Sequence, residues 1–179
     1  SGLGEVVKHA FLATDDELYT FMDENCEAIL NRNLEAMSEM VKLSLFVKKH
    51  FIELDPEEKK GIRSFLNLGH TFGHALETIS EYRVSHGEGV AWGMGRAFEA
   101  GLRCGYTSKE YLDKANALIA KYPFDLDYRV PPSMLDEYMV AIKSDKKKSA
   151  GSVKYVLIED QGKPILSILP DDVVRSVVS

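Results

Sequence analysis

The sequence predicts a mainly α-helical domain of several helices with a small β-hairpin near the C-terminus. Apolar residues recur at three- and four-residue steps over most of the chain up to Ile142, which is the spacing of amphipathic helices. Residues 153–158 and 165–169 are instead rich in β-forming residues and flank a short turn, the pattern of a hairpin. The length of 179 residues suits one domain with its own core.

The first two predicted helices precede a Pro- and Gly-containing break. One helix covers residues 15–29, with Asp15 or Asp16 as its N-cap. Asn33 is the predicted N-cap of the next, which ends before the break at residues 54–61. We expect this helix to bury an apolar stripe formed by Leu34, Met37, Val41, Leu45 and Phe46.

Four further helices and a short terminal one follow. Ser85 lies in the break between the first two of them, and Gly105 ends the second. In order, the predicted helices cover residues 62–82, residues 87–104, the stretch from Thr107 or Ser108 to Tyr122, the stretch from Ser133 to Ile142, and a last short helix beginning at 170–172.

Composition excludes several classes of protein. Hydrophobic residues make up 45% of the chain, yet no apolar run approaches the roughly 20 residues that a membrane span needs. A formal net charge of -6 argues against a nucleic-acid partner, which requires a clustered basic face. We expect a cytoplasmic protein without a signal peptide, in which Cys26 and Cys104 are reduced residues of the core.

Three of the five histidines fall within 17 residues, which indicates metal binding or catalysis. His70 and His74 lie four residues apart on a predicted helix and therefore share a face. His86 comes just before the following helix, which could fold back onto that face. A catalytic zinc site uses about three protein ligands and keeps one position open. The alternative is that these histidines have only structural roles.

Two other patterns resemble known motifs but do not complete them. A zinc metalloprotease needs Glu directly after the first histidine of H-E-x-x-H, and here Thr71 follows His70. The Gly-rich stretch 87–95 lacks the preceding strand and the spacing of a dinucleotide fingerprint. We interpret it as a small-residue face where helices approach closely, so the chain has no dinucleotide site of its own.

Cationic and amide side chains near the histidines suggest a small anionic substrate. Arg63 and Asn67 lie one turn apart and one turn before His70, and Arg suits bidentate recognition of anions. Lys146 and Lys147 belong to a charge run that is either a solvated surface or a phosphate- or carboxylate-binding group.

The run from Arg63 to Glu77, followed by His86-Gly87-Glu88, closely resembles the signature of 3-dehydroquinate synthases. Residues 1–8 are similar to the segment that begins the C-terminal domain of that family, and Asp145-Lys146-Lys147 resembles its late Lys motif. The resemblance implies a multi-helix C-terminal domain of the dehydroquinate synthase type over residues 1–179, without the N-terminal NAD-binding domain.

The resemblance also assigns roles to matching positions. It implies that Glu5, His70 and His86 hold Zn²⁺, with Co²⁺ as a second option, so that Glu5 replaces His74 as the third ligand. His74 then serves substrate binding and proton transfer. The other implied site residues are the catalytic Lys48 (or Lys49, if the register shifts) and Glu58, and the substrate-binding Lys8, Arg63, Asn67, Lys146 and Lys147.

The implied reaction converts 3-deoxy-D-arabino-heptulosonate 7-phosphate to 3-dehydroquinate and phosphate, with NAD as transient oxidant, in a cytoplasmic homodimer of the shikimate pathway. The chain alone is then expected to be inactive. Two alternatives are a related cyclase acting on another sugar phosphate and a non-catalytic helical domain that binds a metal.

Overall fold

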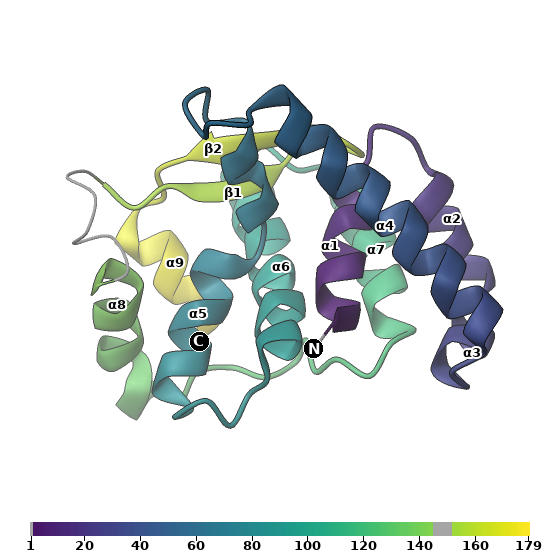
Figure 1. Cartoon of the computed structure of the whole chain (residues 1–179). Helices are drawn as coiled ribbons and strands as arrows, with labels where there is room; N and C mark the ends of the chain where they lie inside the picture. Colours follow the sequence, from purple (N-terminus) through teal and green to yellow (C-terminus); the bar gives the residue numbers. More distant parts are fainter. Residues whose placement is uncertain (1, 145–151) are drawn as a thin grey trace.

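Helix α6 (His86–Arg103) is the central element of the fold, and most of its residues are buried. The computed structural model describes residues 2–144 and 152–179. Helices α1, α5, α7 and α9 and strand β1 all contact α6, while α4 crosses the outer side of α1 (Figure 1). The predicted mainly helical class with a C-terminal hairpin is confirmed.

Most of the elements are joined by connections of a few residues. In chain order they are α1 (Gly2–Leu12), α2 (Glu17–Glu24), α3 (Cys26–Leu30), α4 (Leu34–Leu54), the 3₁₀ turn η1 (Arg63–Asn67), α5 (His70–Ile79), α6, α7 (Lys109–Ala120), η2 (Pro132–Met134), α8 (Leu135–Ser144), β1 (Tyr155–Ile158), β2 (Pro164–Ser167) and α9 (Asp171–Val178). None of the helices in the described residues combines the length and apolar character of a bilayer-crossing segment.

Glycines bring α5 within backbone contact of α6. A Cβ placed on Gly73 would lie 2.5 Å from the carbonyl oxygen of Gly89, and one on Gly93 would lie 2.0 Å from that of Gly69. Both distances are shorter than any Cβ tolerates, so only glycine permits this approach. The predicted small-residue face at residues 87–95 is confirmed.

Helix α1 approaches the start of α6 in the same way. A Cβ on Gly4 would lie 2.1 Å from the carbonyl oxygen of Gly87. The start of α6 is fixed by a capping box in which Ser85 and Glu88 satisfy each other's backbone N–H groups. The first turns of α1 and α6 therefore have a defined relative position.

The hairpin closes one side of the helical core. Strands β1 and β2 are antiparallel, with Tyr155 opposite Ser167, and β1 is buried along its length. The Gln161 side chain in the turn donates hydrogen bonds to the carbonyl oxygens of Ala10 and Ala13 at 2.7 and 2.9 Å, which ties the hairpin to the end of α1.

The buried face of α4 differs from the predicted one. Leu34 is 80% exposed, and Val41, Leu45 and Phe46 are also exposed. The helix instead buries Ala36, Met40, Leu43, Ser44 and Phe51. Both sets follow helical spacing, so the apolar periodicity of this segment fits two faces and does not choose between them.

Two predicted helices are interrupted, and one helix was not predicted. The helix expected over residues 62–82 is η1 followed by α5, because Gly69 adopts a left-handed φ of 79° between them. The helix expected over residues 15–29 is divided at Asn25 into α2 and α3. Helix α1 was not predicted; it buries eight of its eleven residues, and Lys8 and His9 are among them.

The glycine contacts predict a position-dependent effect of added methyl groups. Gly93→Ala should destabilise the protein by about 1–3 kcal/mol, because the new Cβ meets the Gly69 backbone and the two helices must separate. Urea denaturation measures the difference. Gly2→Ala in α1, where nothing lies within 4 Å of the added Cβ, is the control and should be neutral or slightly stabilising. Equal effects of both substitutions would contradict this packing argument.

Candidate metal centre

The residues of the candidate metal centre each neighbour one of the contact glycines. Glu5 follows Gly4 on α1, His86 precedes Gly87 on α6, and His70 follows Gly69 at the start of α5. Because these backbones touch, the three side chains converge. The sequence pattern alone related His86 to His70 only through an assumed helix reversal.

The three side chains meet at ligand-like distances. The Oε1 atom of Glu5 lies 3.1 Å from Nε2 of His70 and 3.3 Å from Nε2 of His86. Two ligand atoms bound to tetrahedral zinc at roughly 2.0–2.1 Å are about 3.3 Å apart. The separations therefore suit a single small divalent cation.

Each histidine ring is anchored through its other nitrogen. Nδ1 of His70 lies 3.2 Å from the carbonyl oxygen of Leu68, and Nδ1 of His86 lies 3.0 Å from Oε1 of Glu77. Both partners are acceptors, so Nδ1 carries the proton and Nε2 of a neutral ring presents its lone pair. This is the tautomer that a metal-binding histidine requires.

The Oε1 atom of Glu5, which faces the two histidines, has no hydrogen-bond donor to pair with among the described residues. This oxygen is also buried. Two lone-pair nitrogens and an anionic oxygen that face one another repel, and a cation bound among them relieves this repulsion. Glu5, His70 and His86 therefore fit a Zn²⁺ or Co²⁺ ion in the donor atoms they offer.

Charge around Glu5 keeps it ionised. Burial by itself would raise the pKa of Glu5, but the neighbouring His70 and the Lys8 ammonium outweigh burial and hold that pKa well below its usual range. Lys8 donates to Oε2 of Glu5 at 2.6 Å and is almost fully buried. Burial lowers the pKa of Lys8, although its contact with Glu5 opposes this effect.

His74 lies beside the same cluster but faces an open cleft. One nitrogen from each of His70, His74 and His86 lies within 4.8 Å of the other two, so these three side chains also form a possible metal-binding group. His74 lines a cleft of about 380 Å³ together with Asn67, His70 and Lys154. The three-histidine set remains a geometrically possible alternative, while the cleft gives His74 access to a bound small molecule.

The loop before η1 brings the predicted Arg63 and Glu58 together. Arg63 Nη1 lies 3.0 Å from Oε1 of Glu58, whose backbone has a left-handed φ of 56°. Buried Asp55 accepts hydrogen bonds from the backbone N–H groups of Lys60 and Arg63 at 3.0 and 3.2 Å and so shapes this loop. Sequence reasoning missed Asp55, which the Asp-Pro turn signal could have indicated.

Lys48 and Lys49, adjacent on α4, interact with different groups. Lys49 pairs with Glu53 at 3.5 Å on the outer surface. The charge of Lys48, by contrast, adds to the stronger effect of burial in lowering the pKa values of Lys8 and His9. This proximity to Lys8 and His9 favours Lys48 over Lys49 as the residue near the centre. Lys146 and Lys147 lie outside the described residues.

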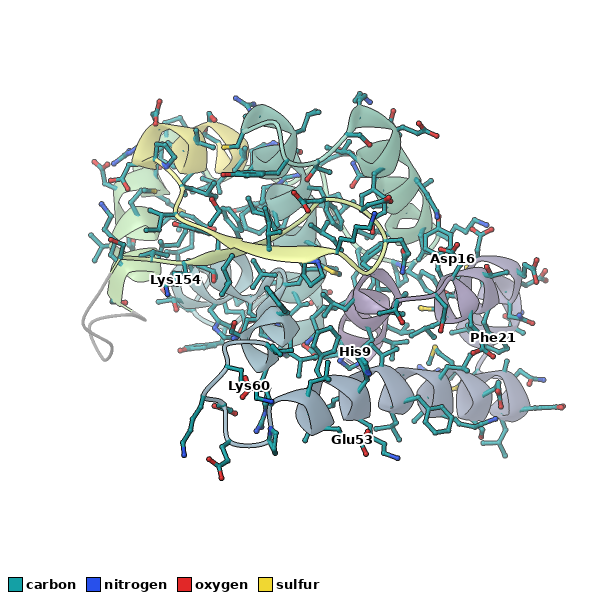
Figure 2. All side chains as sticks on the ribbon, turned by 90° about the horizontal axis from the view of Figure 1, so that it is seen from above. His9, Asp16, Phe21, Glu53, Lys60 and Lys154 are labelled. Carbon is teal, nitrogen blue, oxygen red and sulfur yellow. The ribbon has the colours of Figure 1, made fainter. Side chains whose placement is uncertain are left out.

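The structure adds two buried residues that the sequence analysis did not single out. Glu77 anchors His86, as described above. His9 lies between α1 and α4 (Figure 2), where its Nδ1 atom is 2.7 Å from Oγ of Ser44. Burial, reinforced by the charge of Lys8, lowers the pKa of His9 to about 3. The sequence signal that could have pointed to His9 is its position four residues after Glu5, on the same face of a helix.

The sequence matches one family over most of its length. Residues 2–148 match the family model described as 3-dehydroquinate synthase C-terminal. The chain is 35% identical to a bifunctional 3-dehydroquinate synthase/phosphatase of Fusobacterium nucleatum, covering 99% of this chain and 26% of that protein. It is 36% identical to a 3-dehydroquinate synthase of Francisella tularensis, covering 90% of this chain and 45% of that protein.

Solved structures share the fold at lower identity. The 2-epi-5-epi-valiolone synthase ValA of Streptomyces hygroscopicus, solved with NAD⁺ and Zn²⁺, superposes with a TM-score of 0.82 at 17% identity, covering 98% of this chain and 49% of that one. A 2-deoxy-scyllo-inosose synthase complexed with carbaglucose-6-phosphate, NAD⁺ and Co²⁺ gives 0.83 at 20% identity, covering 99% and 50%. The chain thus spans half or less of the proteins it matches.

The buried His9 predicts acid sensitivity of the metal-free fold. Its folded pKa of about 3 lies below the unfolded value near 6.5, so the unfolded state binds the extra proton as pH falls. Lowering pH from 7.5 to 5 should cost about 2 kcal/mol of unfolding free energy through this residue. Urea denaturation of the wild type and His9→Gln at both pH values, with chelator present, measures it. The variant should lose correspondingly less stability over this interval, and equal losses would contradict the assignment.

Proposed function

Because the chain belongs to the 3-dehydroquinate synthase C-terminal family, we propose that it is the metal- and substrate-binding part of a 3-dehydroquinate synthase. The proposed reaction converts 3-deoxy-D-arabino-heptulosonate 7-phosphate to 3-dehydroquinate and phosphate, with NAD bound by residues outside this sequence. The observation that carries the proposal is the convergence of Glu5 Oε1 with the Nε2 atoms of His70 and His86, beside cationic residues and a cleft.

The proposed metal ligands are Glu5, His70 and His86, with an open position for substrate. The distances of 3.1 and 3.3 Å from Glu5 Oε1 to the Nε2 atoms of His70 and His86 support this set. When bound, the divalent ion would lower the pKa of a substrate hydroxyl and polarise a ketone. Lys8 neutralises the second carboxylate oxygen of Glu5 and holds it in place.

The remaining residues bind and orient the substrate. Arg63 and Asn67 would donate hydrogen bonds to its anionic and hydroxyl groups, and Glu58 fixes the Arg63 guanidinium. His74, which borders the cleft, would accept and return a proton at neutral pH. Lys48 would add positive charge from α4, and Lys146 and Lys147 are proposed as further phosphate or carboxylate contacts.

Lys154 is an additional candidate for substrate contact. It lines the cleft from the segment that leads into β1 (Figure 2), so the hairpin contributes a cation to the site. We further propose that the full-length enzyme is a cytoplasmic homodimer. The exposed apolar residues of α4 are compatible with burial against protein.

A related sugar-phosphate cyclase is the second candidate. The likeness of the fold to the 2-deoxy-scyllo-inosose and 2-epi-5-epi-valiolone synthases favours it, whereas the 35–36% identity to proteins named 3-dehydroquinate synthase favours the first proposal. Identification of the product made by the full-length protein distinguishes the two.

The proposed ligand set predicts the metal affinity of variants. The chain should bind one Zn²⁺ or Co²⁺ ion, and Glu5→Gln or His70→Asn should weaken binding by at least the roughly 10–100-fold that loss of an outer-shell partner costs, because each replaces one of three ligands with a weak neutral amide. Competition with a chromophoric chelator measures this. His50→Asn, which changes an exposed histidine of α4, is the control and should bind as the wild type does. Unchanged affinity in Glu5→Gln would contradict the proposed set.

The catalytic role predicts metal-dependent binding of substrate-like anions. A non-hydrolysable phosphonate analogue should bind the zinc-loaded chain more tightly than the chelated chain, and Arg63→Met should weaken binding about 10–100-fold through loss of charge-assisted hydrogen bonds. Calorimetric titration measures both effects. Metal binding without influence on the phosphonate would instead favour a non-catalytic metal domain.

The same samples test whether the chain turns over alone. With substrate, NAD and Zn²⁺, we expect no phosphate release above that of the Glu5→Gln variant. Release well above this background would contradict the proposal that NAD is bound by residues outside this sequence.

A further inference from the structure

We propose that Glu77 is a positioning residue of the metal centre, which holds the His86 ring so that Nε2 faces Glu5 and His70. The inference rests on the proposed metal site and extends it to a residue that does not itself contact the metal or substrate. The observation behind it is a buried carboxylate on α5 that pairs with a proposed ligand on α6.

The geometry is that of a carboxylate–histidine–metal arrangement. Oε1 of Glu77 lies 3.0 Å from Nδ1 of His86, while Nε2 on the opposite side of the ring lies 3.3 Å from Oε1 of Glu5. Such a carboxylate fixes the tautomer and orientation of the ring and makes the ligating nitrogen a stronger donor.

The surroundings of Glu77 leave it few other functions. Glu77 is only 8% exposed, and within the described part of the chain its carboxylate is paired with the N–H of the His86 ring. A buried carboxylate without a compensating contact is costly, so the His86 N–H is the group that makes its burial tolerable. The contact between Glu77 and His86 does not by itself determine what the opposite side of the ring faces. In this structure that side faces Glu5.

The helix contact also leaves space for this carboxylate. A Cβ on Gly89 would lie 2.9 Å from Oε1 of Glu77 and within 3.3 Å of the Gly73 carbonyl oxygen. Gly89 therefore permits both the backbone contact of α5 with α6 and the location of the Glu77 side chain. Glycine at position 89 thus serves both the helix packing and the contact between Glu77 and His86.

His86 depends on this anchor more than His70 does. The His86 side chain is 40% exposed, whereas that of His70 is 14% exposed and its Nδ1 atom meets a backbone carbonyl. Without Glu77, the His86 ring has little packing to stop it from rotating. We therefore expect removal of the carboxylate to act on the metal through His86.

The test compares Glu77→Leu and Glu77→Gln with the wild type. Glu77→Leu should weaken Zn²⁺ binding about 10–100-fold, and Glu77→Gln should recover part of the loss because its amide oxygen still accepts the Nδ1 hydrogen. Chelator competition gives the affinities, and the Co²⁺ absorption spectrum reports a changed coordination. The control is Glu99→Gln, which alters a carboxylate of α6 that pairs with Arg96 and Arg129, and it should change neither readout.

A readout on the wild type covers the case in which Glu77→Leu fails to fold. In the metal-free protein at neutral to alkaline pH, nitrogen-15 NMR should show His86 protonated on Nδ1. The opposite tautomer would overturn the inference, as would a folded Glu77→Leu with wild-type affinity and Co²⁺ spectrum. A wild type that binds no divalent ion would overturn the proposed metal site, and this inference with it.

Discussion

The candidate site depends on the backbone contacts that glycines allow between α6 and its two neighbours. Gly73 and Gly89 bring α5 against α6, and Gly4 does the same for α1 at Gly87. A side chain larger than hydrogen at these positions would collide with the facing backbone, so the helices could not approach this closely. The short distances between the backbones of these helices therefore determine which polar side chains meet at the site.

Electrostatics then decides what this arrangement can hold. A buried, ionised Glu5 is compensated on one oxygen by Lys8, while its other oxygen faces two imidazole nitrogens. An anion at that point would increase the repulsion, whereas a divalent cation relieves it. The adjoining cleft, with His74, Asn67 and Lys154 on its walls, gives an anionic substrate access to the same point.

The sequence predicted those features that depend on local pattern. His70 and His74 share a helix, Ser108 and Asn33 cap theirs, and the Gly-rich stretch is a helix contact. It did not predict the buried face of α4, where two stripes have helical spacing, nor α1, in which polar residues such as Lys8 and His9 are buried with the apolar ones. The place of Glu77 depends on how two helices align, and a single sequence pattern does not contain that information.

The central claim is that Glu5, from the start of the chain, joins His70 and His86 on one ion. Anomalous diffraction at the zinc absorption edge, from crystals of the zinc-loaded protein, tests it most directly. The account predicts one strong peak within bonding distance of Glu5 and of Nε2 of both histidines. A peak bound by His70, His74 and His86, with the Glu5 carboxylate turned away, would contradict it.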